Sequence, residues 1–241
     1  MDMEERLQKI LSRHGYGSRR EAEKYIIDGK VTVNGKLAIL GQKADESRDS
    51  IKIGRKILRK KELENVYIAF NKPRGVISDV VKVRNEKIVR DFIDIPDHIF
   101  IVGRLDKDSE GLMLLTNDGD LTNQLTHPRY EHEKEYDVLL NRTPDTKQLK
   151  AWCNGVVLED GIRTGKARVD IVYQDSKGCW VRVVMQEGKK RQIRETAARI
   201  GLFVKRIIRK RIGTLELGDL PKGRWRYLSQ KEINALKKGL V

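Results

Sequence analysis

The hydrophobic positions in the first 60 residues predict two short helices followed by a small sheet. Apolar side chains over residues 7–14 recur at the spacing of one helical face, and glycines then end that helix. Ser18 and Glu21 form a capping box that begins a second helix. Alternating valines over residues 31–35 end in Asn-Gly, a strong hairpin signal, and residues 51–53 supply a further strand. The pattern indicates two helices packed with a small sheet.

From Val66 onward the pattern changes to short apolar strands separated by turns. Strands are expected over residues 66–71, 76–77, 100–102, 112–115, 133–140, 167–172 and 180–185. Helices are expected through Leu121 and Leu125, from Pro144, over residues 192–200, and after a cap at Ser229. Runs of strands with a few helices between them favour an α+β domain with a mixed, mainly antiparallel sheet over a doubly wound fold.

The segment from Gly103 to Gly119 joins a charged turn to a strand without polar positions. Residues 112–115 are an uninterrupted apolar run, which is typical of a strand buried on both faces. Four acids lie within the segment, and Asp106 is one of those that precede the strand. A carboxylate held at the mouth of a buried strand is a candidate for chemistry.

Three alternative roles for this segment can be tested on the residues. An EF-hand loop that begins at Asp106 should end in a bidentate Glu, but its twelfth position is Asn117. A hydrolase nucleophile elbow needs Gly two residues before Ser109, where this chain has Lys. In the third alternative Arg104 and Asp106 merely brace a turn, and the residues alone leave this possibility open.

Length and charge indicate a folded protein with a polyanionic partner. The chain of 241 residues suffices for one large core and a small satellite domain. A net charge of +15, with a pI near 9.8, points to nucleic acid. The sequence has no apolar run of about 18 residues and no signal-peptide core after its first residues, so we expect a cytoplasmic protein without a membrane interaction.

Metal and cofactor chemistry lack the residues that they need. Cys153 and Cys179 form no C-x-x-C pair and are expected to remain reduced thiols. The four histidines lack paired-ligand spacing, and the chain has neither a P-loop nor a dinucleotide fingerprint. We therefore predict a reaction that uses no metal ion and no small-molecule cofactor.

Basic residues occupy the outward positions of both N-terminal helices. Residues 1–60 hold 15 bases against 9 acids. A solvated face is the usual role of one charged helix, but a surplus across two helices is more typical of phosphate contact. The residues expected to bind RNA here are Arg6, Lys9, Arg13, Arg19, Arg20 and Lys24.

A second concentration of positive charge lies between Arg182 and Arg211. This stretch holds eleven bases and two acids, and its surplus of nine equals the surplus of the whole of residues 61–241. An evenly solvated surface would not concentrate charge in this way, so we expect the strand-helix-strand unit of residues 182–211 to face RNA. Lys189, Lys190 and Arg191, just before the predicted helix, are the candidate contacts.

Two sets of motifs resemble known families. Residues 4–51 carry E-R-L-x-K-I-L-S-R-x-G-x-x-S-R-R-E-A-E, which resembles the RNA-binding module named after a small-subunit ribosomal protein. The later motifs G-R-L-D-x-D-S-E-G-L, N-K-P-x-G, E-K-E-Y and G-x-x-R-Q-I-R resemble those of RNA pseudouridine synthases, and the whole chain is similar to the RsuA family. The resemblance implies an RNA-binding module over 1–60 and a catalytic domain over 61–241.

The resemblance also implies roles for single residues. Asp106 would be the essential carboxylate, acting either as a nucleophile at the anomeric carbon of the target uridine or as a base at the neighbouring ribose carbon. Arg104 would fill the stack that the flipped nucleotide leaves, and Tyr136 would lie against the uracil. Arg194 would pair with Asp106 and hold it ionised. Tyr136 as a core residue and Arg194 as a phosphate ligand are the structural alternatives.

Other positions of the motifs imply contacts rather than catalysis. Lys72 and Arg74, in the N-K-P-x-G motif, are expected to contact RNA or to be structural. The family commonly has a second arginine after R-Q-I-R, where this chain has Glu195. That acid could weaken an RNA contact or pair with Arg191 or Arg199.

The residues and the resemblance together predict a monomeric pseudouridine synthase for ribosomal RNA. The D-K-D-S-E-G and H-E-K-E-Y variants favour large-subunit over small-subunit RNA. The rival hypothesis is a non-catalytic assembly factor that binds ribosomal RNA, in which Asp106 only braces a turn. A glycosidase that releases free uracil is a third possibility, although such enzymes usually employ two carboxylates.

Overall fold

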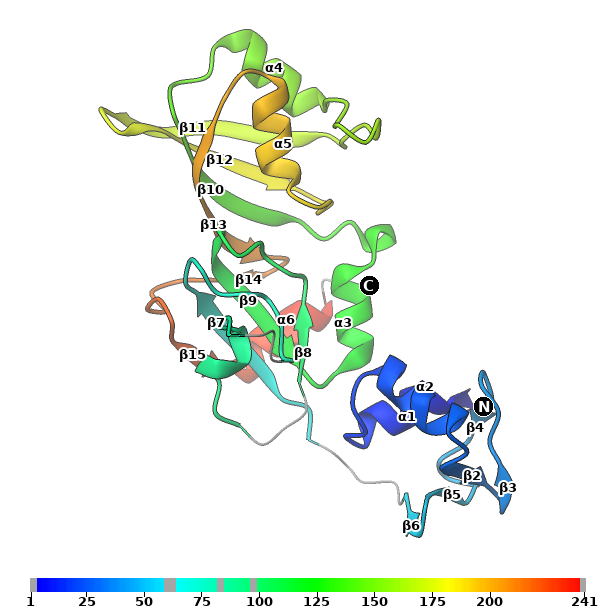
Figure 1. Cartoon of the computed structure of the whole chain (residues 1–241). Helices are drawn as coiled ribbons and strands as arrows, with labels where there is room; N and C mark the ends of the chain where they lie inside the picture. The colour runs from blue at the N-terminus through cyan, green and yellow to red at the C-terminus, as the bar shows by residue number, and fades with distance from the viewer. Residues whose placement is uncertain (1–3, 59–63, 82–84, 96–98, 239–241) are drawn as a thin grey trace. The chain divides into compact units, whose positions relative to one another are not determined.

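The computed structural model describes residues 4–58, 64–81, 85–95 and 99–238 (Figure 1). The chain divides into two compact units, with the boundary after Asn65. The boundary that we expected after residue 60 falls within residues 59–63, which lie outside the described residues. The first unit has one hydrophobic core, and the second unit has two.

The described residues of the first unit form two helices and two small sheets. The helices are α1 (Leu7–Arg13) and α2 (Arg19–Ile27). The four-stranded sheet has the order β3-β2-β5-β6, formed by β2 (Val31–Val33), β3 (Lys36–Leu37), β5 (Ile51–Ile53) and β6 (Lys56–Ile57). A separate pair joins β1 (Glu5–Arg6) to β4 (Lys43–Ala44).

Local sequence signals account for these elements. The Ser18 hydroxyl accepts a hydrogen bond from the Glu21 N–H at 3.3 Å, and the Glu21 carboxylate accepts one from the Ser18 N–H at 2.6 Å. This reciprocal capping starts α2 where the sequence predicted it. Asn34 and Gly35 both have positive φ, as the tight hairpin between β2 and β3 requires. The predicted two-helix-plus-hairpin module is confirmed.

The second unit is built on one mixed sheet of nine described strands. Its strands are β7 (Tyr67–Lys72), β8 (Phe100–Val102), β9 (Glu110–Thr116), β10 (Lys134–Leu140), β11 (Ala167–Asp175), β12 (Gly178–Met185), β13 (Val204–Ile212), β14 (Leu215–Glu216) and β15 (Trp225–Tyr227). The order is β11-β12-β10-β13-β9-β7-β15, with β14 on β13 and β8 on β9. Strands β13 and β9 run parallel, and the other pairs are antiparallel.

Helices cover both faces of this sheet (Figure 1). They are α3 (Gly119–Thr126), α4 (Thr146–Asn154), α5 (Gln192–Arg199) and α6 (Gln230–Lys238), with 3-10 turns at Val89–Phe92 and Pro128–Tyr130. Helices α4 and α5 pack into the core that holds Met113 and Leu115 of β9, whereas α3 and α6 pack into the core that holds Leu112 and Leu114. Because alternate residues of β9 enter different cores, the strand has no polar face, as its apolar run predicted.

Two expectations for the second unit are wrong in detail. Ile77 takes part only in an isolated bridge to Ile88, so residues 76–77 do not begin a strand. The neighbouring Ser78 instead bonds the backbone of Leu105 through its hydroxyl, which holds this segment without a ladder. Helix α4 begins at Thr146, with Asp145 as its cap, rather than at Pro144. The α+β class with a mixed, mainly antiparallel sheet is confirmed.

Candidate active site

A cleft of about 450 Å³ in the second unit brings together residues that are far apart in the sequence. The β8–β9 loop contributes Arg104 and Asp106, and β10 contributes Tyr136. The turn before α5 contributes Lys189, Lys190 and Arg191 to the same lining. The cleft opens on the face of the sheet that α4 and α5 cover, because Tyr136 belongs to their core. The predicted carboxylate, tyrosine and basic residues therefore share one site.

Side chains from other elements hold the loop that carries Asp106. The Ser78 hydroxyl donates to the Leu105 carbonyl at 2.5 Å and accepts from the Leu105 N–H at 3.1 Å. The Ser109 N–H donates to the Asp106 carbonyl at 3.0 Å, which closes the turn. The Gly75 N–H donates to the Lys107 carbonyl at 2.8 Å. Every residue from 105 to 107 thus has a backbone group fixed by a hydrogen bond.

Lys72 is a buried clamp of this loop and not the RNA contact that the sequence suggested. Its side chain is completely buried, and its ammonium donates to three carbonyls: Ser109 at 2.6 Å, Pro73 at 3.1 Å and Lys107 at 3.3 Å. Burial lowers the pKa of Lys72 to about 8, although Glu110 and Asp106 oppose this shift. A lysine with all its donors used inside the protein cannot reach a phosphate, so the structural alternative for Lys72 is correct.

Arg209 holds the other side of the loop, and none of the sequence motifs revealed it. Its Nε donates to the Leu112 carbonyl at 2.7 Å, and a terminal nitrogen donates to the Gly103 carbonyl at 3.0 Å. The side chain is 1% exposed and lies opposite Tyr136 in the β10–β13 register. Burial lowers the pKa of Arg209, and the nearby Tyr136 hydroxyl opposes this shift. One guanidinium therefore connects both ends of the Asp106 loop with the tyrosine of the cleft.

A sequence signal for Arg209 existed in the alternation of β13. Ile207 belongs to the core on the cleft face, and a period of two places Arg209 on that face as well. Charged residues are rarely fully buried, so the charge of Arg209 suggested an exposed residue that contacts RNA, like its basic neighbours.

Gly111 lets the two parallel strands meet behind the loop. A Cβ atom at this position would overlap the Arg209 carbonyl oxygen and lie 2.6 Å from the Arg209 backbone nitrogen, and the residue has φ of +104°. No other residue fits so close an approach of backbones without movement. The Gly in the motif therefore brings β9, and the loop before it, against the strand that supplies Arg209.

The Asp106 carboxylate is left free by all of these contacts. Within the described residues no donor lies in hydrogen-bonding range of its side chain, and no ion pair reaches it. Its side chain is half-buried at the cleft, whereas the acids around it have other roles. Glu110 is buried between Arg206 at 2.7 Å and Lys222 at 2.8 Å, and Asp118 caps α3. Asp106 is thus the acid of the cleft lining whose acceptor capacity is available to a ligand.

The expected ion pair between Arg194 and Asp106 is not formed in the part of the chain that the structure describes. Arg194 donates to the carbonyls of Val204 at 3.1 Å and Asp108 at 3.3 Å, so its guanidinium ties α5 to β13 and to the turn. Burial lowers the pKa of Arg194, and the positive charge of Arg191 lowers it further. The negative charge of Asp106 opposes this shift. Arg194 therefore attracts Asp106 without touching it, because two backbone carbonyls hold its terminal nitrogens.

The rim of the cleft carries cations with freer side chains. For Arg104, Lys190 and Arg191, the described residues contain no side-chain partner within bonding distance, and all three residues are exposed. Arg191 has φ of +53°, an uncommon value for a residue other than glycine. Lys189 lies in the lining but pairs with Glu187 at 3.2 Å.

Two further predicted positions lie outside the lining. Arg74 is exposed and lies 4.0 Å from Asp108. Glu195 forms no ion pair with Arg191 or Arg199 among the described residues.

The basic surplus between residues 182 and 211 is partly neutralised inside the unit. Arg182 lies 3.1 Å from Glu135, and Arg211 lies 3.2 Å from the same carboxylate. Arg206 binds the buried Glu110. Acids of β9 and β10 thus pair with three of its strand arginines. The free positive charge is restricted to the turn before α5 and a few exposed positions.

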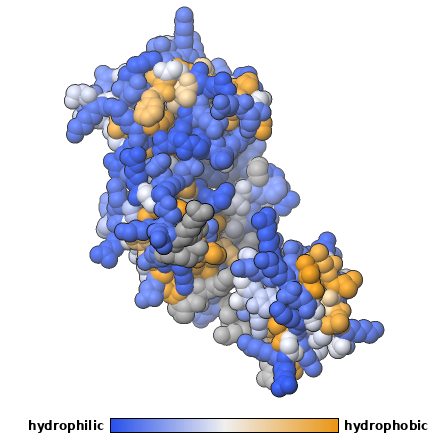
Figure 2. Space-filling view, viewed as in Figure 1, coloured by the Kyte–Doolittle hydropathy of each residue, from blue (hydrophilic) through white to orange (hydrophobic). Residues whose placement is uncertain are grey.

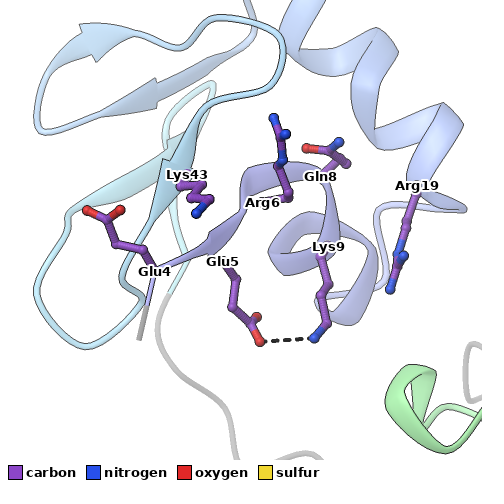
Figure 3. A pocket seen from close by; sticks show the side chains of 7 residues that line it. All are labelled: Glu4, Glu5, Arg6, Gln8, Lys9, Arg19 and Lys43. Carbon is purple, nitrogen blue, oxygen red and sulfur yellow. Dashed lines mark hydrogen bonds and ion pairs between the residues drawn. The ribbon is translucent and has the colours of Figure 1, made fainter. Parts of the chain in front are cut away.

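The first unit has a second hollow, of about 330 Å³, beside α1 (Figure 3). Three of the predicted RNA contacts, Arg6, Lys9 and Arg19, line it together with Lys43. Lys9 pairs with Glu5 at 3.1 Å, as the dashed line in Figure 3 marks.

The other three predicted contacts of this unit, Arg13, Arg20 and Lys24, are exposed outside the hollow. Arg13 is bound by Glu5 and Glu46. Exposed apolar side chains lie elsewhere on the unit, at Ile27, Leu37, Ile39 and Leu40, and Figure 2 shows an apolar patch there.

Neither a metal centre nor a membrane span is found among the described residues. Nowhere in them do three His, Cys, Asp or Glu side chains gather as metal ligands. No described helix has the length and apolar character needed to cross a bilayer. Cys153 and Cys179 are free thiols.

The second unit thus combines a mixed sheet with a cleft that holds a carboxylate, a tyrosine and exposed cations. A family model described as RNA pseudouridylate synthase matches residues 66–199, and the S4 domain model matches residues 5–46. The chain belongs to the RNA pseudouridylate synthase family and is a pseudouridine synthase with an N-terminal S4 domain.

Individual relatives cover nearly the whole chain. It is 39% identical over 238 residues to the ribosomal large subunit pseudouridine synthase B of Bacillus subtilis, a match that covers 97% of this chain and 96% of the relative. It is 36% identical to the dual-specificity RNA pseudouridine synthase RluF of Escherichia coli, over 96% of this chain and 78% of that protein. A crystal structure of a pseudouridylate synthase superimposes with a TM-score of 0.70 and 28% identity, covering 96% of this chain and 99% of that one.

Proposed function

We propose that this chain converts uridine to pseudouridine at a specific site in ribosomal RNA, with large-subunit RNA as the preferred substrate, and that Asp106 is its essential carboxylate. The observation that carries the proposal is the free Asp106 side chain on a loop fixed from several sides. The similarity to a synthase named for the large ribosomal subunit supports the choice of RNA. We further propose that the chain acts as a monomer in the cytoplasm.

The reaction exchanges one bond of the ribose for another. The bond from the anomeric carbon to N1 of uracil breaks with its electrons staying on the base, and the base turns. The anomeric carbon then bonds to C5, which loses its proton, while N1 takes up a proton. Asp106 supports this exchange either by attacking the anomeric carbon or by removing a proton from the neighbouring ribose carbon. A single carboxylate suffices because the detached base is retained and no water has to be activated.

The cleft can receive only a nucleotide that has left its stack. Flipping a nucleotide costs roughly a few kcal/mol, which contacts inside and outside the cleft must offset. We propose that Tyr136 packs against the extruded uracil and that Arg104, exposed beside Asp106, enters the vacated position in the RNA. Lys190 and Arg191 on the opposite part of the lining would contact the flanking phosphates.

Lys72, Arg209 and Arg194 are proposed as positioning residues. Each donates to backbone carbonyls of the Asp106 loop or of the strand that follows, and none of them pairs with the carboxylate within the described residues. A reactive group that is held in place beforehand avoids reorganisation during the reaction.

Pseudouridine mapping of ribosomal RNA from cells with and without this protein tests the proposed function. One or a few positions, expected in large-subunit RNA, should lose pseudouridine when the protein is absent and regain it when the wild-type chain is supplied. The same positions should remain uridine when the Asp106→Asn chain is supplied. Identical maps in all strains, with the purified protein still binding ribosomal RNA, would favour the assembly factor instead. Release of free uracil during turnover would indicate the glycosidase.

A further inference from the structure

A cluster of rings and one guanidinium lies on the surface between α3 and β10. It consists of His127, Arg129, Tyr130 and His132, which we call the aromatic cluster. Tyr130 belongs to none of the three hydrophobic cores that the described residues form. Core packing therefore does not account for the gathering of these rings.

Tyr130 is the centre of the aromatic cluster. The His132 ring lies nearly parallel to it, with 23° between planes and 6.3 Å between centroids, and the His127 ring meets it edge-on at 6.3 Å. The Arg129 guanidinium carbon lies 4.5 Å from the Tyr130 ring centroid, and Arg129 also donates to the Tyr130 hydroxyl. Tyr130 thus packs with the two exposed members of the cluster, His127 and Arg129, and with the half-buried His132.

The backbone of the cluster is ordered in advance of any ligand. The Tyr130 N–H donates to the His127 carbonyl at 3.1 Å, and the Arg129 N–H donates to the His127 ring at 3.2 Å. Glu131 has φ of +49°, a left-handed conformation that is uncommon outside glycine. This conformation reverses the chain between Tyr130 and His132, so that both rings can face each other. A preformed surface loses little entropy when it binds.

The aromatic cluster is joined directly to the rim of the cleft. The Lys134 ammonium donates to the His132 carbonyl at 3.2 Å and to the Gln186 carbonyl at 3.3 Å. Gln186 lies between Met185 and Gly188 in the sequence, and both of these residues line the cleft. The aromatic cluster is therefore held against the segment that supplies Met185 and Gly188 to the cleft lining.

The charges of this segment favour contact with a base over contact with a phosphate. Glu131 is exposed and opposes the charge of Arg129, and Glu133 is bound by Arg211 at 2.9 Å. Without a surplus of positive charge the segment gains little from a phosphate. Aromatic and guanidinium faces do stack with unpaired bases, whatever their sequence.

We propose that the aromatic cluster is a stacking site for an unpaired base next to the target uridine. The proposal rests on RNA as the substrate and deepens the proposed function by naming a second base that the enzyme holds. Such a site would favour loops and bulges, where a neighbouring base is already unstacked, and it would help to keep the strand open after the uridine has flipped.

Fluorescence of 2-aminopurine tests this proposal in the full-length Asp106→Asn chain, which removes turnover from the measurement. Fragments that tile large-subunit RNA would each carry one 2-aminopurine at an unpaired position. We expect one position to be quenched on binding and the quenching to be lost in Tyr130→Ala. The dissociation constant should rise about tenfold, while the slope of its logarithm against the logarithm of salt concentration stays unchanged.

Two companion variants make the result specific. Arg129→Lys keeps the charge but removes the planar group, so it should weaken quenching without altering the salt slope. Tyr173→Ala removes a tyrosine that is 56% exposed on the edge strand β11, and it should leave quenching and affinity unchanged. Thermal unfolding of each variant would establish that the fold is retained.

The proposal is overturned if Tyr130→Ala binds RNA as tightly as Tyr173→Ala, or if no labelled position is quenched. A shallower salt slope in Tyr130→Ala would also overturn it, because that result indicates a lost phosphate contact. The experiment does not measure pseudouridine. If the wild-type chain isomerised uridine while Tyr130→Ala bound RNA normally, only the stacking site would be wrong.

Discussion

The cations beneath the cleft and the cations on its rim belong to the same residue types but have opposite surroundings. Lys72 and Arg209 are fully buried, and their donors point at backbone carbonyls. Arg104 and Arg191 are exposed on the lining, with no side-chain partner among the described residues. The first pair can act only on the protein, whereas the second pair is free to act on RNA.

This difference shows that burial and not charge decides what a basic residue does in this enzyme. A buried cation is tolerated only if its donors are satisfied, and here carbonyls of the Asp106 loop satisfy them. The loop and the cations are therefore interdependent: the carbonyls solvate the charges, and the charges hold the loop. The rim cations do not hold the loop, so their loss should weaken RNA binding without disturbing the loop.

Among variants that distinguish the buried cations from the rim cations, we expect the largest effect from Arg209→Lys. The ammonium keeps the charge but cannot bridge the Gly103 and Leu112 carbonyls, because Lys lacks the planar fork. We expect kcat to fall by about 100-fold through misplacement of Asp106, and the RNA dissociation constant to change by less than about threefold. Single-turnover kinetics at saturating RNA would measure the first quantity, and filter binding the second.

Arg211→Lys is the matched control on the same strand. Arg211 binds Glu133 and Glu135 and contacts no part of the Asp106 loop in the described structure, so kcat should stay within about threefold of wild type. An Arg209→Lys enzyme that turns over normally would show that Arg209 does not position the loop.

The next effect concerns the rim. Replacing both Lys190 and Arg191 by Ala should raise the RNA dissociation constant about tenfold at low salt and reduce the salt slope by about 1.5, since each phosphate contact contributes about 0.7 to 0.9. The value of kcat at saturating RNA should change little. Lys147→Ala with Lys150→Ala removes the same charge from exposed positions of α4 and serves as the control. Equal slopes for the two double variants would refute a specific role for the rim.

The smallest effect concerns the pH dependence of stability. In the folded protein burial lowers the pKa of Lys72 to about 8, compared with 10.5 for the exposed side chain. Between these pH values the unfolded chain binds more protons than the folded one, so the contribution of Lys72 to the free energy of unfolding rises with pH. Below pH 8 both states are protonated, and the cost of burying the charge is constant.

Chemical denaturation of wild type and Lys72→Met at several pH values would measure this contribution. The difference between their free energies of unfolding, wild type minus variant, should increase by ~1 kcal/mol from pH 7 to pH 9. Lys134→Met, at a lysine whose pKa is lowered less strongly, provides a comparison. A difference that is constant or falls with pH would mean that Lys72 keeps its proton in the folded protein.

Patterns that act along the chain predicted most elements correctly. The capping box at Ser18 began α2, the apolar run of residues 112–115 became a strand buried on both faces, and the alternation before Met185 became β12. These signals are local, because caps and periodicity depend on neighbours within a few residues. The fold class followed from them.

Such local patterns could not predict contacts between segments that are distant in the sequence. Lys72 is buried because carbonyls at positions 107 and 109 converge on it from a loop 35 to 37 residues away. Arg194 was expected to pair with Asp106, but its terminal nitrogens donate to the carbonyls of Asp108 and Val204 instead. The motifs correctly brought Asp106, Tyr136 and Arg104 to one cleft. They could not distinguish a cation that touches the substrate from one that supports the loop.

The proposed chemistry depends most directly on the carboxylate of Asp106, and one pair of variants isolates it. Asp106→Asn and Asp108→Asn make the same chemical change on the same turn, but the Asp108 side chain is 56% exposed and pairs weakly with Arg74 at 4.0 Å. Pseudouridine formation in ribosomal RNA should fall by more than about 1,000-fold in Asp106→Asn, with RNA still bound, and by less than about threefold in Asp108→Asn. Substantial activity in Asp106→Asn, or equal losses in both variants, would contradict an essential role for this carboxylate.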